Sequence, residues 1–263
     1  MRGLRPMSDA QPITGCRPGD VTEHVFLCGD PGRVEQIASE WTETREVCNV
    51  REYRIIRGLD DGLPVTVAST GIGAPSAAVL IEELAKLGSR TFIRVGSSGG
   101  LDPALQLGEL AITSASIRDD GTSASYVIPE YPAAAHHRVV AALEDAAVSL
   151  GVPHQVGVTW SFDAFYARNA TATAPGEMAS MSYGGYWPSH MEARIRDMQA
   201  ARVMNCEMES GVLLTLAGLF GLRAGSICIV SDRTPWEGPA QIDFEANMGS
   251  CVQVARTAMR SLV

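Results

Sequence analysis

Charged side chains stand where strand-like runs of apolar residues end in glycine-rich turns. Arg94 lies inside the apolar run Thr91–Gly96, where a charge is costly unless a carboxylate or a bound ligand compensates it. Arg33 closes the turn Cys28–Arg33, in which Gly29 lets a ligand approach the backbone. Ligands of open α/β sheets bind beyond the carboxyl ends of the strands. The pattern predicts an anion site, with pairing of Arg94 to a buried carboxylate as the alternative.

A second group of polar residues has the chemistry to hold a sugar and a leaving group. Glu207 and Glu209 flank a methionine before the apolar stretch Gly211–Phe220, and two carboxylates here could hold paired hydroxyls such as those of ribose. Glu209 also suits the start of a helix, so a capping role is the alternative. Asp232 follows the apolar run Ser226–Val230, where it could donate a proton to a leaving group or serve only to form a turn.

Composition and missing motifs exclude several classes of protein. The 263 residues carry 21 basic and 30 acidic side chains, a formal charge of −9, and no Lys/Arg-rich run, so neither nucleic acid nor an anionic membrane is an expected partner. An anionic substrate therefore needs a local cluster of arginines. The G-x-G at Gly71–Gly73 lacks a third glycine and is followed by Pro75, which argues against a dinucleotide site.

The cysteines and the apolar segments indicate the cellular compartment of the protein. The six cysteines are scattered without a CxxC pair, which favours buried free thiols over disulfides or a zinc site. The first residues lack the apolar core of a secretion signal, and the longest apolar run, Val212–Leu222, is too short to span a bilayer. We therefore expect a cytoplasmic protein.

Strand-like and helix-like segments alternate along the chain. The predicted strands are Val25–Cys28, Tyr53–Arg57, Val65–Ser69, Phe92–Val95, Leu110–Ser114, Gly157–Trp160 and Ser226–Val230. The predicted helices are Arg33–Trp41, Ser76–Leu87, His137–Leu150, Glu209–Phe220 and Ile242–Leu262. This alternation predicts a single α/β domain whose central sheet is covered by helices on both faces. The stretch Arg168–Pro188 has no period and is expected to be a long loop or a partly ordered insertion.

Five motifs, in order along the chain, give a resemblance to a known family. They are GDPGRV, STGIGAPSAA, RTFIRVGSSGG, FDAFYA and NCEMES. On these, the chain resembles the trimeric or hexameric nucleoside phosphorylase superfamily, in the branch of uridine phosphorylases and bacterial purine nucleoside phosphorylases. The resemblance implies a distorted, barrel-like mixed sheet, with residues 1–17 as an N-terminal arm and 18–263 as the phosphorylase domain. It also implies inorganic phosphate as co-substrate, no organic cofactor, and homodimers that share active sites within a hexamer.

The resemblance assigns roles residue by residue. Phosphate is expected to bind to Gly29, Arg33, Arg94 and Ser97, with Arg51 supplied by a neighbouring subunit. Ribose is expected to bind to Met208 and Glu209, and the base to Ser98, Gly99, Phe165, Asn169 and Glu207. Potassium is expected to bind to Glu52, Ile72 and Ser76. Asp232, Arg94 and Glu209 are the expected catalytic residues. The implied reaction cleaves a nucleoside with phosphate to give a free base and a (deoxy)ribose 1-phosphate.

The choice of base follows from departures from the family pattern. Uridine phosphorylases read uracil with a glutamine and an arginine, whereas Asn169 and Thr171 stand at those positions, with Asn169 or Arg168 as possible substitutes. The Ser-Asp pair that ends in Asp232 resembles that of purine phosphorylases, so a purine base is expected and uridine is the alternative.

Further alternatives concern the 5′ position of the nucleoside and the type of reaction. The N-terminal segment has Gln11 or Ile13 where the family has a histidine for the 5′-hydroxyl, which predicts tolerance of 5′-modified nucleosides. A hydrolase of the same fold and a non-catalytic nucleoside-binding protein are the rival interpretations.

Overall fold

The computed structural model describes residues 9–236 and 243–263. Its strands are β1 (His24–Cys28), β2 (Thr42–Val50), β3 (Tyr53–Asp60), β4 (Leu63–Ser69), β5 (Thr91–Gly100), β6 (Leu110–Asp119), β7 (Ala133–Ala134), β8 (His154–Phe162), β9 (Ala170–Ala174), β10 (Glu177–Ser180), β11 (Asn205–Glu207) and β12 (Arg223–Arg233). Its helices are α1 (Arg33–Ala38), α2 (Ala74–Lys86), α3 (Gly121–Tyr126), α4 (His137–Ser149), α5 (Phe165–Arg168), the 3-10 helix η1 (Tyr183–Gly185), α6 (Met191–Ala200), α7 (Ser210–Phe220) and α8 (Met248–Ser261).

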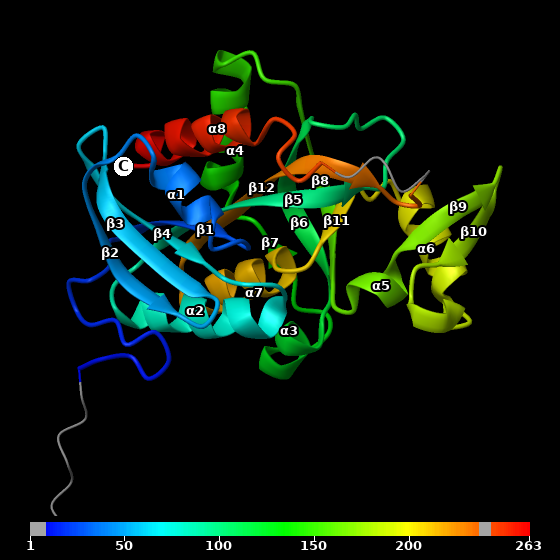
Figure 1. The fold of residues 1–263 in the computed structure, drawn as a ribbon, viewed down its shortest axis with the longest axis horizontal. Coiled ribbons are helices and arrows are strands. Elements are labelled where there is room, and N and C mark those ends of the chain that lie inside the picture. The colour runs from blue at the N-terminus through cyan, green and yellow to red at the C-terminus, as the bar shows by residue number, and fades with distance from the viewer. Residues whose placement is uncertain (1–8, 237–242) are drawn as a thin grey trace, which may run out of the picture.

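A mixed sheet in the order β11-β8-β6-β12-β5-β1-β4-β3-β2 forms the centre of the molecule (Figure 1). Because β11 pairs with β5 as well as with β8, the strands β5, β12, β6, β8 and β11 close into a ring. The strands β1, β4, β3 and β2 extend from this ring as a wing. The predicted distorted, barrel-like sheet within one α/β domain is confirmed.

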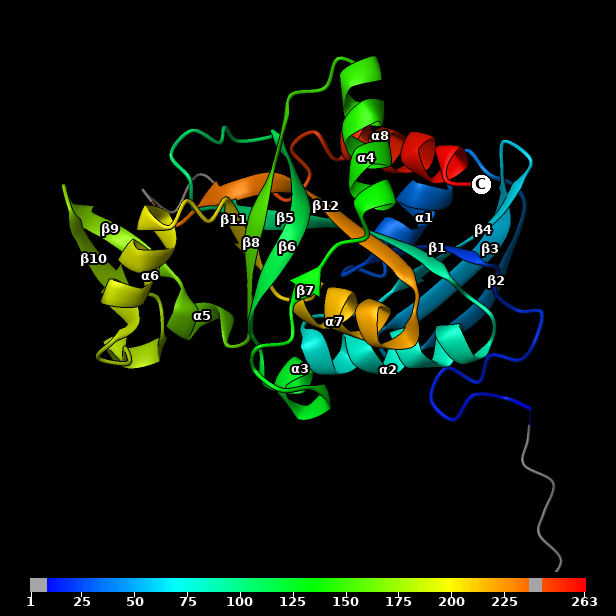
Figure 2. The ribbon, with the colours of Figure 1, turned by 180° about the vertical axis from the view of Figure 1, so that it is seen from behind.

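Helices cover both faces of the sheet, as the alternation predicted. Figure 1 and the view from behind in Figure 2 place α1, α4 and α8 on one side and α2 and α7 on the other. Each layer has its own buried apolar cluster, one built around residues such as Ile37 and Val254, the other around Leu80 and Leu214. Strands enclosed on both faces read as continuous apolar runs, and all five residues of β1 are buried.

The carboxyl ends of four strands meet on one edge and position the candidate site. The strands β4 and β5 both run parallel to β1, and β12 runs parallel to β5. Their ends therefore point the same way. The glycine-rich turns after β1 and β4 and the distal halves of β5 and β12 consequently lie together, as the rule for open α/β sheets predicts.

Segment boundaries differ from the sequence expectations, and several elements, among them β2, β9, β10, β11, α3 and α6, were not predicted. The predicted loop Arg168–Pro188 contains the hairpin β9–β10, with Gly176 in the left-handed region (φ 79°) at its turn. Strand β2 was missed because most of its residues are exposed and it lacks an apolar alternation. The last helix begins at Met248, and Ile242, its predicted start, lies outside the described residues.

The cysteines and the N-terminal segment have the environments described next. All six cysteines are buried and free, as predicted. Within the part of the chain that the structure describes, no helix is long and apolar enough to cross a bilayer. In the predicted N-terminal arm, the backbone N–H groups of Ile13 and Thr14 donate to the carboxylate of Glu83 at 2.9 and 2.8 Å.

Candidate active site

A cavity of about 940 Å³ opens at the carboxyl ends of β1, β4, β5 and β12. Its lining includes most of the residues that the sequence singled out: Gly29, Arg33, Glu52, Ile72, Arg94, Ser97, Ser98, Gly99, Phe165, Asn169, Glu207, Met208, Glu209 and Asp232. Arg51 and Ser76 are the two predicted site residues outside that lining. Segments up to about two hundred residues apart in the sequence thus share one concave site.

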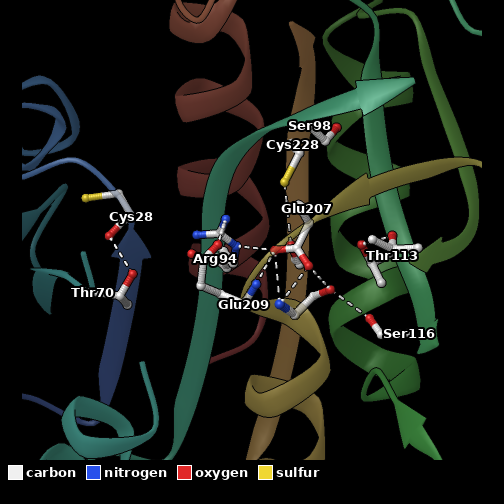
Figure 3. A network of polar contacts seen from close by, with 12 residues as sticks. Cys28, Thr70, Arg94, Ser98, Thr113, Ser116, Glu207, Glu209 and Cys228 are labelled. Carbon is white, nitrogen blue, oxygen red and sulfur yellow. Dashed lines mark hydrogen bonds and ion pairs between the residues drawn. The ribbon is translucent and has the colours of Figure 1, made fainter. Parts of the chain in front are cut away.

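Two buried carboxylates that also line the cavity bind Arg94 (Figure 3). Its Nε donates to Glu207 Oε2 at 3.0 Å and its Nη2 to Glu209 Oε2 at 2.5 Å. Burial disfavours the charged guanidinium, but Glu209 and Glu207 outweigh it and raise the pKa of Arg94. Its Nη1 is buried and has no hydrogen-bond partner among the described residues. The ion pairing that was the alternative interpretation of Arg94 therefore forms, and the Nη1 group is still left to donate to an anionic ligand.

Glu209 joins three segments at the same point. One carboxylate oxygen accepts from Arg94, and the other accepts the backbone N–H of Gly73 at 2.5 Å, at the start of α2. Burial raises the pKa of Glu209, while the positive charge of Arg94 acts against that rise. A carboxylate has about four lone-pair sites, so both oxygens of Glu209 keep capacity for further donors such as sugar hydroxyls.

Arg33 also lines the cavity and is 7% exposed. Its Nη2 forms an ion pair with Glu245 Oε1 at 3.2 Å, and its buried Nε has no partner among the described residues. Arg51 is exposed at the turn between β2 and β3, in the left-handed region (φ 55°), and does not reach this chain's own cavity.

Aromatic and amide side chains also line the cavity. Phe165 and the buried Asn169 face it, and Asn169 Oδ1 accepts from Thr234 Oγ1 at 3.1 Å. The two other candidates for reading a base lie elsewhere. Arg168 pairs with Asp119 at 2.5 Å, and Thr171 belongs to β9, outside the lining. Of the three, Asn169 is the residue within reach of a base.

Asp232 is a buried carboxylate that lines the same cavity. Its Oδ1 accepts from Ser231 Oγ and its Oδ2 from Trp236 Nε1, each at 2.7 Å. Burial raises the pKa of Asp232, and the two hydrogen bonds lower it by a smaller amount. Trp236 also contacts the Phe165 ring, with centroids 6.1 Å apart. Sequence reasoning missed Trp236, although its place four residues after Asp232 is a signal that could have been used.

The close packing around residue 99 requires a glycine, because there is no room for a side chain. A Cβ atom there would lie 3.0 Å from Asp232 Oδ2, 3.0 Å from Thr234 Oγ1 and 3.2 Å from Cys206 Sγ. We expect Gly99→Ala to displace the Asp232 carboxylate, to lower the free energy of unfolding by about 1–3 kcal/mol, and to reduce kcat/KM. Thermal unfolding and steady-state kinetics measure both. Gly249→Ala, where a Cβ meets nothing within 4 Å, is the control. It should leave kcat/KM near wild type and should not lower the free energy of unfolding, because alanine favours a helix more than glycine does. A loss of stability and activity equal to that of Gly99→Ala would contradict the expectation.

Two of the three residues of the expected potassium site contact each other, and the third is exposed. Ser76 Oγ lies within hydrogen-bond distance of Glu52 Oε1, at 2.9 Å, and of the Thr70 carbonyl oxygen, and its single O–H can be donated to either acceptor, whereas Ile72 is 81% exposed. No group of three or more His, Cys, Asp or Glu side chains within residues 9–236 and 243–263 is arranged to hold a metal ion. Potassium binding stays a prediction.

Fold and site together define a phosphorylase. Residues 23–263 match the family model described as the phosphorylase superfamily, and the chain belongs to this family, in its nucleoside phosphorylase branch. It is a nucleoside phosphorylase, a pentosyltransferase whose co-substrate is inorganic phosphate. The predicted family and enzyme class are confirmed.

Particular relatives give a narrower comparison. A uridine phosphorylase of Thermococcus kodakarensis is 48% identical over 215 residues, covering 82% of this chain and 74% of the relative. The uridine phosphorylase of Escherichia coli is 39% identical over 236 residues, 89% of this chain and 90% of the relative. A guanosine phosphorylase of Halorubrum lacusprofundi is 34% identical over 220 residues, 84% of this chain and 82% of the relative.

Proposed function

We propose that this enzyme cleaves uridine-type pyrimidine nucleosides with inorganic phosphate, releasing the pyrimidine and ribose 1-phosphate. The observation that carries the proposal is the convergence of Arg33, Arg94 and Glu209 on one cavity. An oxyanion and a sugar diol can thus be bound side by side. The aromatic and amide lining beside them leaves room for a flat base.

The reaction follows from this placement. Phosphate is bound by Arg33 and Arg94, with Gly29 and Ser97 beside it, and an oxygen of the phosphate attacks C1′ of the ribose. The C1′–N bond breaks as the C1′–O bond forms, and the electron pair of the broken bond leaves with the base. The guanidinium groups position the nucleophile, while negative charge on the phosphate stabilises the cationic sugar in the transition state. Glu209, beside Met208, binds the 2′- and 3′-hydroxyls.

The charge balance of the cavity supports a site completed by a second copy of the chain. Its lining has two arginines and six acidic residues: Asp30, Glu52, Glu207, Glu209, Asp232 and Glu245. Two of these, Glu207 and Glu209, already compensate Arg94. A further cation is needed for tight phosphate binding. Arg51, exposed on a turn of the wing, can supply it to a neighbouring subunit in a homodimer, with hexamer assembly as part of the same proposal.

We assign a pyrimidine base to the substrate, in place of the purine expected from the Ser231-Asp232 pair. Relatives at 48% and 39% identity are named uridine phosphorylases, whereas a guanosine phosphorylase matches at 34% identity. These findings support the uridine alternative better than the purine expectation. Asn169 and Phe165 are the residues that we assign to the base, with Ser98, Gly99 and Asp232 around it.

A substrate panel tests the proposal. Uridine, thymidine, inosine, guanosine and 5′-deoxyuridine are assayed with and without phosphate. We expect kcat/KM for uridine to exceed that for inosine and guanosine at least about tenfold, with no base release when phosphate is omitted. We also expect 5′-deoxyuridine to be cleaved nearly as well as uridine, because Gln11 or Ile13 stands where the family has a histidine.

Three results would contradict parts of this proposal. Faster cleavage of a purine nucleoside would return the base assignment to the purine alternative. Base release at the same rate without phosphate would indicate a hydrolase. Tight nucleoside binding with no turnover at any phosphate concentration would indicate a binding protein.

A further inference from the structure

Glu207 lines the cavity, yet its carboxylate is fully engaged inside the protein. Its Oε1 accepts the Ser210 backbone N–H at 2.9 Å and the Ser210 hydroxyl at 2.5 Å. Its Oε2 accepts Arg94 Nε at 3.0 Å and the Glu209 backbone N–H at 2.9 Å, with a second contact to the Ser210 N–H at 3.0 Å. Four donor groups therefore meet about four lone-pair sites.

A saturated carboxylate cannot bind a base as well. A base N–H would have to displace one of the internal donors, and that donor would then be buried without a partner at a cost larger than the gain. The Glu207 side chain is 2% exposed, so water cannot replace a displaced partner. The resemblance places Glu207 at the base, but its hydrogen bonds are directed to Arg94 and to the start of α7.

The donors of Glu207 belong to the parts of the site that bind phosphate and ribose. The bond to Arg94 Nε fixes the plane of the guanidinium, and the bond from Glu209 N–H fixes the backbone of the residue assigned to the sugar. Ser210 is held in turn by Ser116 of β6, whose hydroxyl lies 2.7 Å from its own. This chain of polar contacts is drawn in Figure 3.

We propose that Glu207 is a positioning residue that orients Arg94 toward phosphate and takes no part in reading the base. With Nε bound to Glu207 and Nη2 bound to Glu209, the guanidinium has one rotational setting, and Nη1 is the donor left over. A guanidinium fixed before phosphate arrives loses less conformational entropy on binding. The inference rests on the proposed function, since it assigns Glu207 a role at the phosphate of that same reaction.

The variant Glu207→Gln tests this role. Glutamine keeps the shape but replaces one acceptor oxygen with an NH₂ donor, which faces either Arg94 Nε–H or the Ser210 donors. We expect the KM for phosphate to rise about tenfold or more. The KM for uridine and the ratio of kcat/KM between uridine and thymidine should stay within about twofold of wild type. Ser210→Ala, which removes one of the four donors, should shift the phosphate KM in the same direction by less.

Controls separate positioning from general loss of structure. Glu192→Gln changes an exposed carboxylate on α6 that pairs with Arg196, and it should leave both KM values unchanged. Calorimetry without nucleoside measures phosphate affinity directly and needs no turnover. If Glu207→Gln does not fold, the same measurement is made on Ser210→Ala. An unchanged phosphate KM together with altered uridine-to-thymidine selectivity would overturn the inference. A wild-type enzyme that consumes no phosphate would instead refute the proposed function, so the two failures are distinguishable.

Discussion

Arg94→Met is expected to lower kcat/KM for uridine by about a thousandfold and to destabilise the fold. The variant removes the donor assigned to phosphate and leaves Glu207 and Glu209 buried without a cation. Breaking a buried ion pair by removing one partner costs about 3–5 kcal/mol of folding free energy. Steady-state kinetics with varied phosphate, together with urea unfolding, measure the two effects.

The conservative variant Arg94→Lys separates charge from geometry. An ammonium group keeps the charge but cannot bind Glu207, Glu209 and phosphate at once in the planar arrangement of a guanidinium. We therefore expect Arg94→Lys to recover most of the stability and only part of the activity. Activity of Arg94→Met within about tenfold of wild type would show that this arginine does not bind the nucleophile.

Glu209→Gln is expected to reduce kcat/KM for uridine by about a hundredfold or more. The amide loses the charge that pairs with Arg94 and one of the two acceptors available to the sugar hydroxyls. The decisive comparison uses 2′,3′-dideoxyuridine, which has no hydroxyls for Glu209 to bind. On that substrate, the variant and the wild type should differ far less.

The two substrates and two enzymes form a double cycle. If Glu209 binds the diol, the penalty of the substitution largely disappears when the diol is absent, and the coupling between the two changes is large. Equal penalties on both substrates would show that Glu209 acts only through Arg94 or through the start of α2, where it accepts the N–H of Gly73. In that case, residues other than Glu209 would have to bind the ribose hydroxyls.

Most of the cavity could be predicted because its residues follow strand ends. Arg94 stood out as a charge within an apolar strand, and Arg33, Glu209 and Asp232 each follow or end such a run. Parallel strands bring their carboxyl ends together, so residues far apart in sequence meet without any signal from the loops between them. The closed ring of strands came from the family resemblance and not from periodicity.

Other features needed the three-dimensional structure. The sequence pattern does not reveal which hydrogen-bond donors a carboxylate accepts. The pattern therefore placed Glu207 at the site, and the resemblance assigned it to the base, but neither showed that its carboxylate is saturated by internal donors. The contact of Trp236 with Asp232 depends on the turn after β12. The hairpin β9–β10 was missed because alternating Ala and Thr carry almost no amphipathic signal.

The central claim is that phosphate, bound by the arginines of this cavity, is the nucleophile at C1′. Incubation of uridine with ¹⁸O-labelled phosphate, followed by mass spectrometry of the sugar product, tests it most directly. The account predicts ribose 1-phosphate that carries all four labelled oxygens, in an amount equal to the uracil released. Free ribose without label, formed at a rate independent of phosphate, would contradict it.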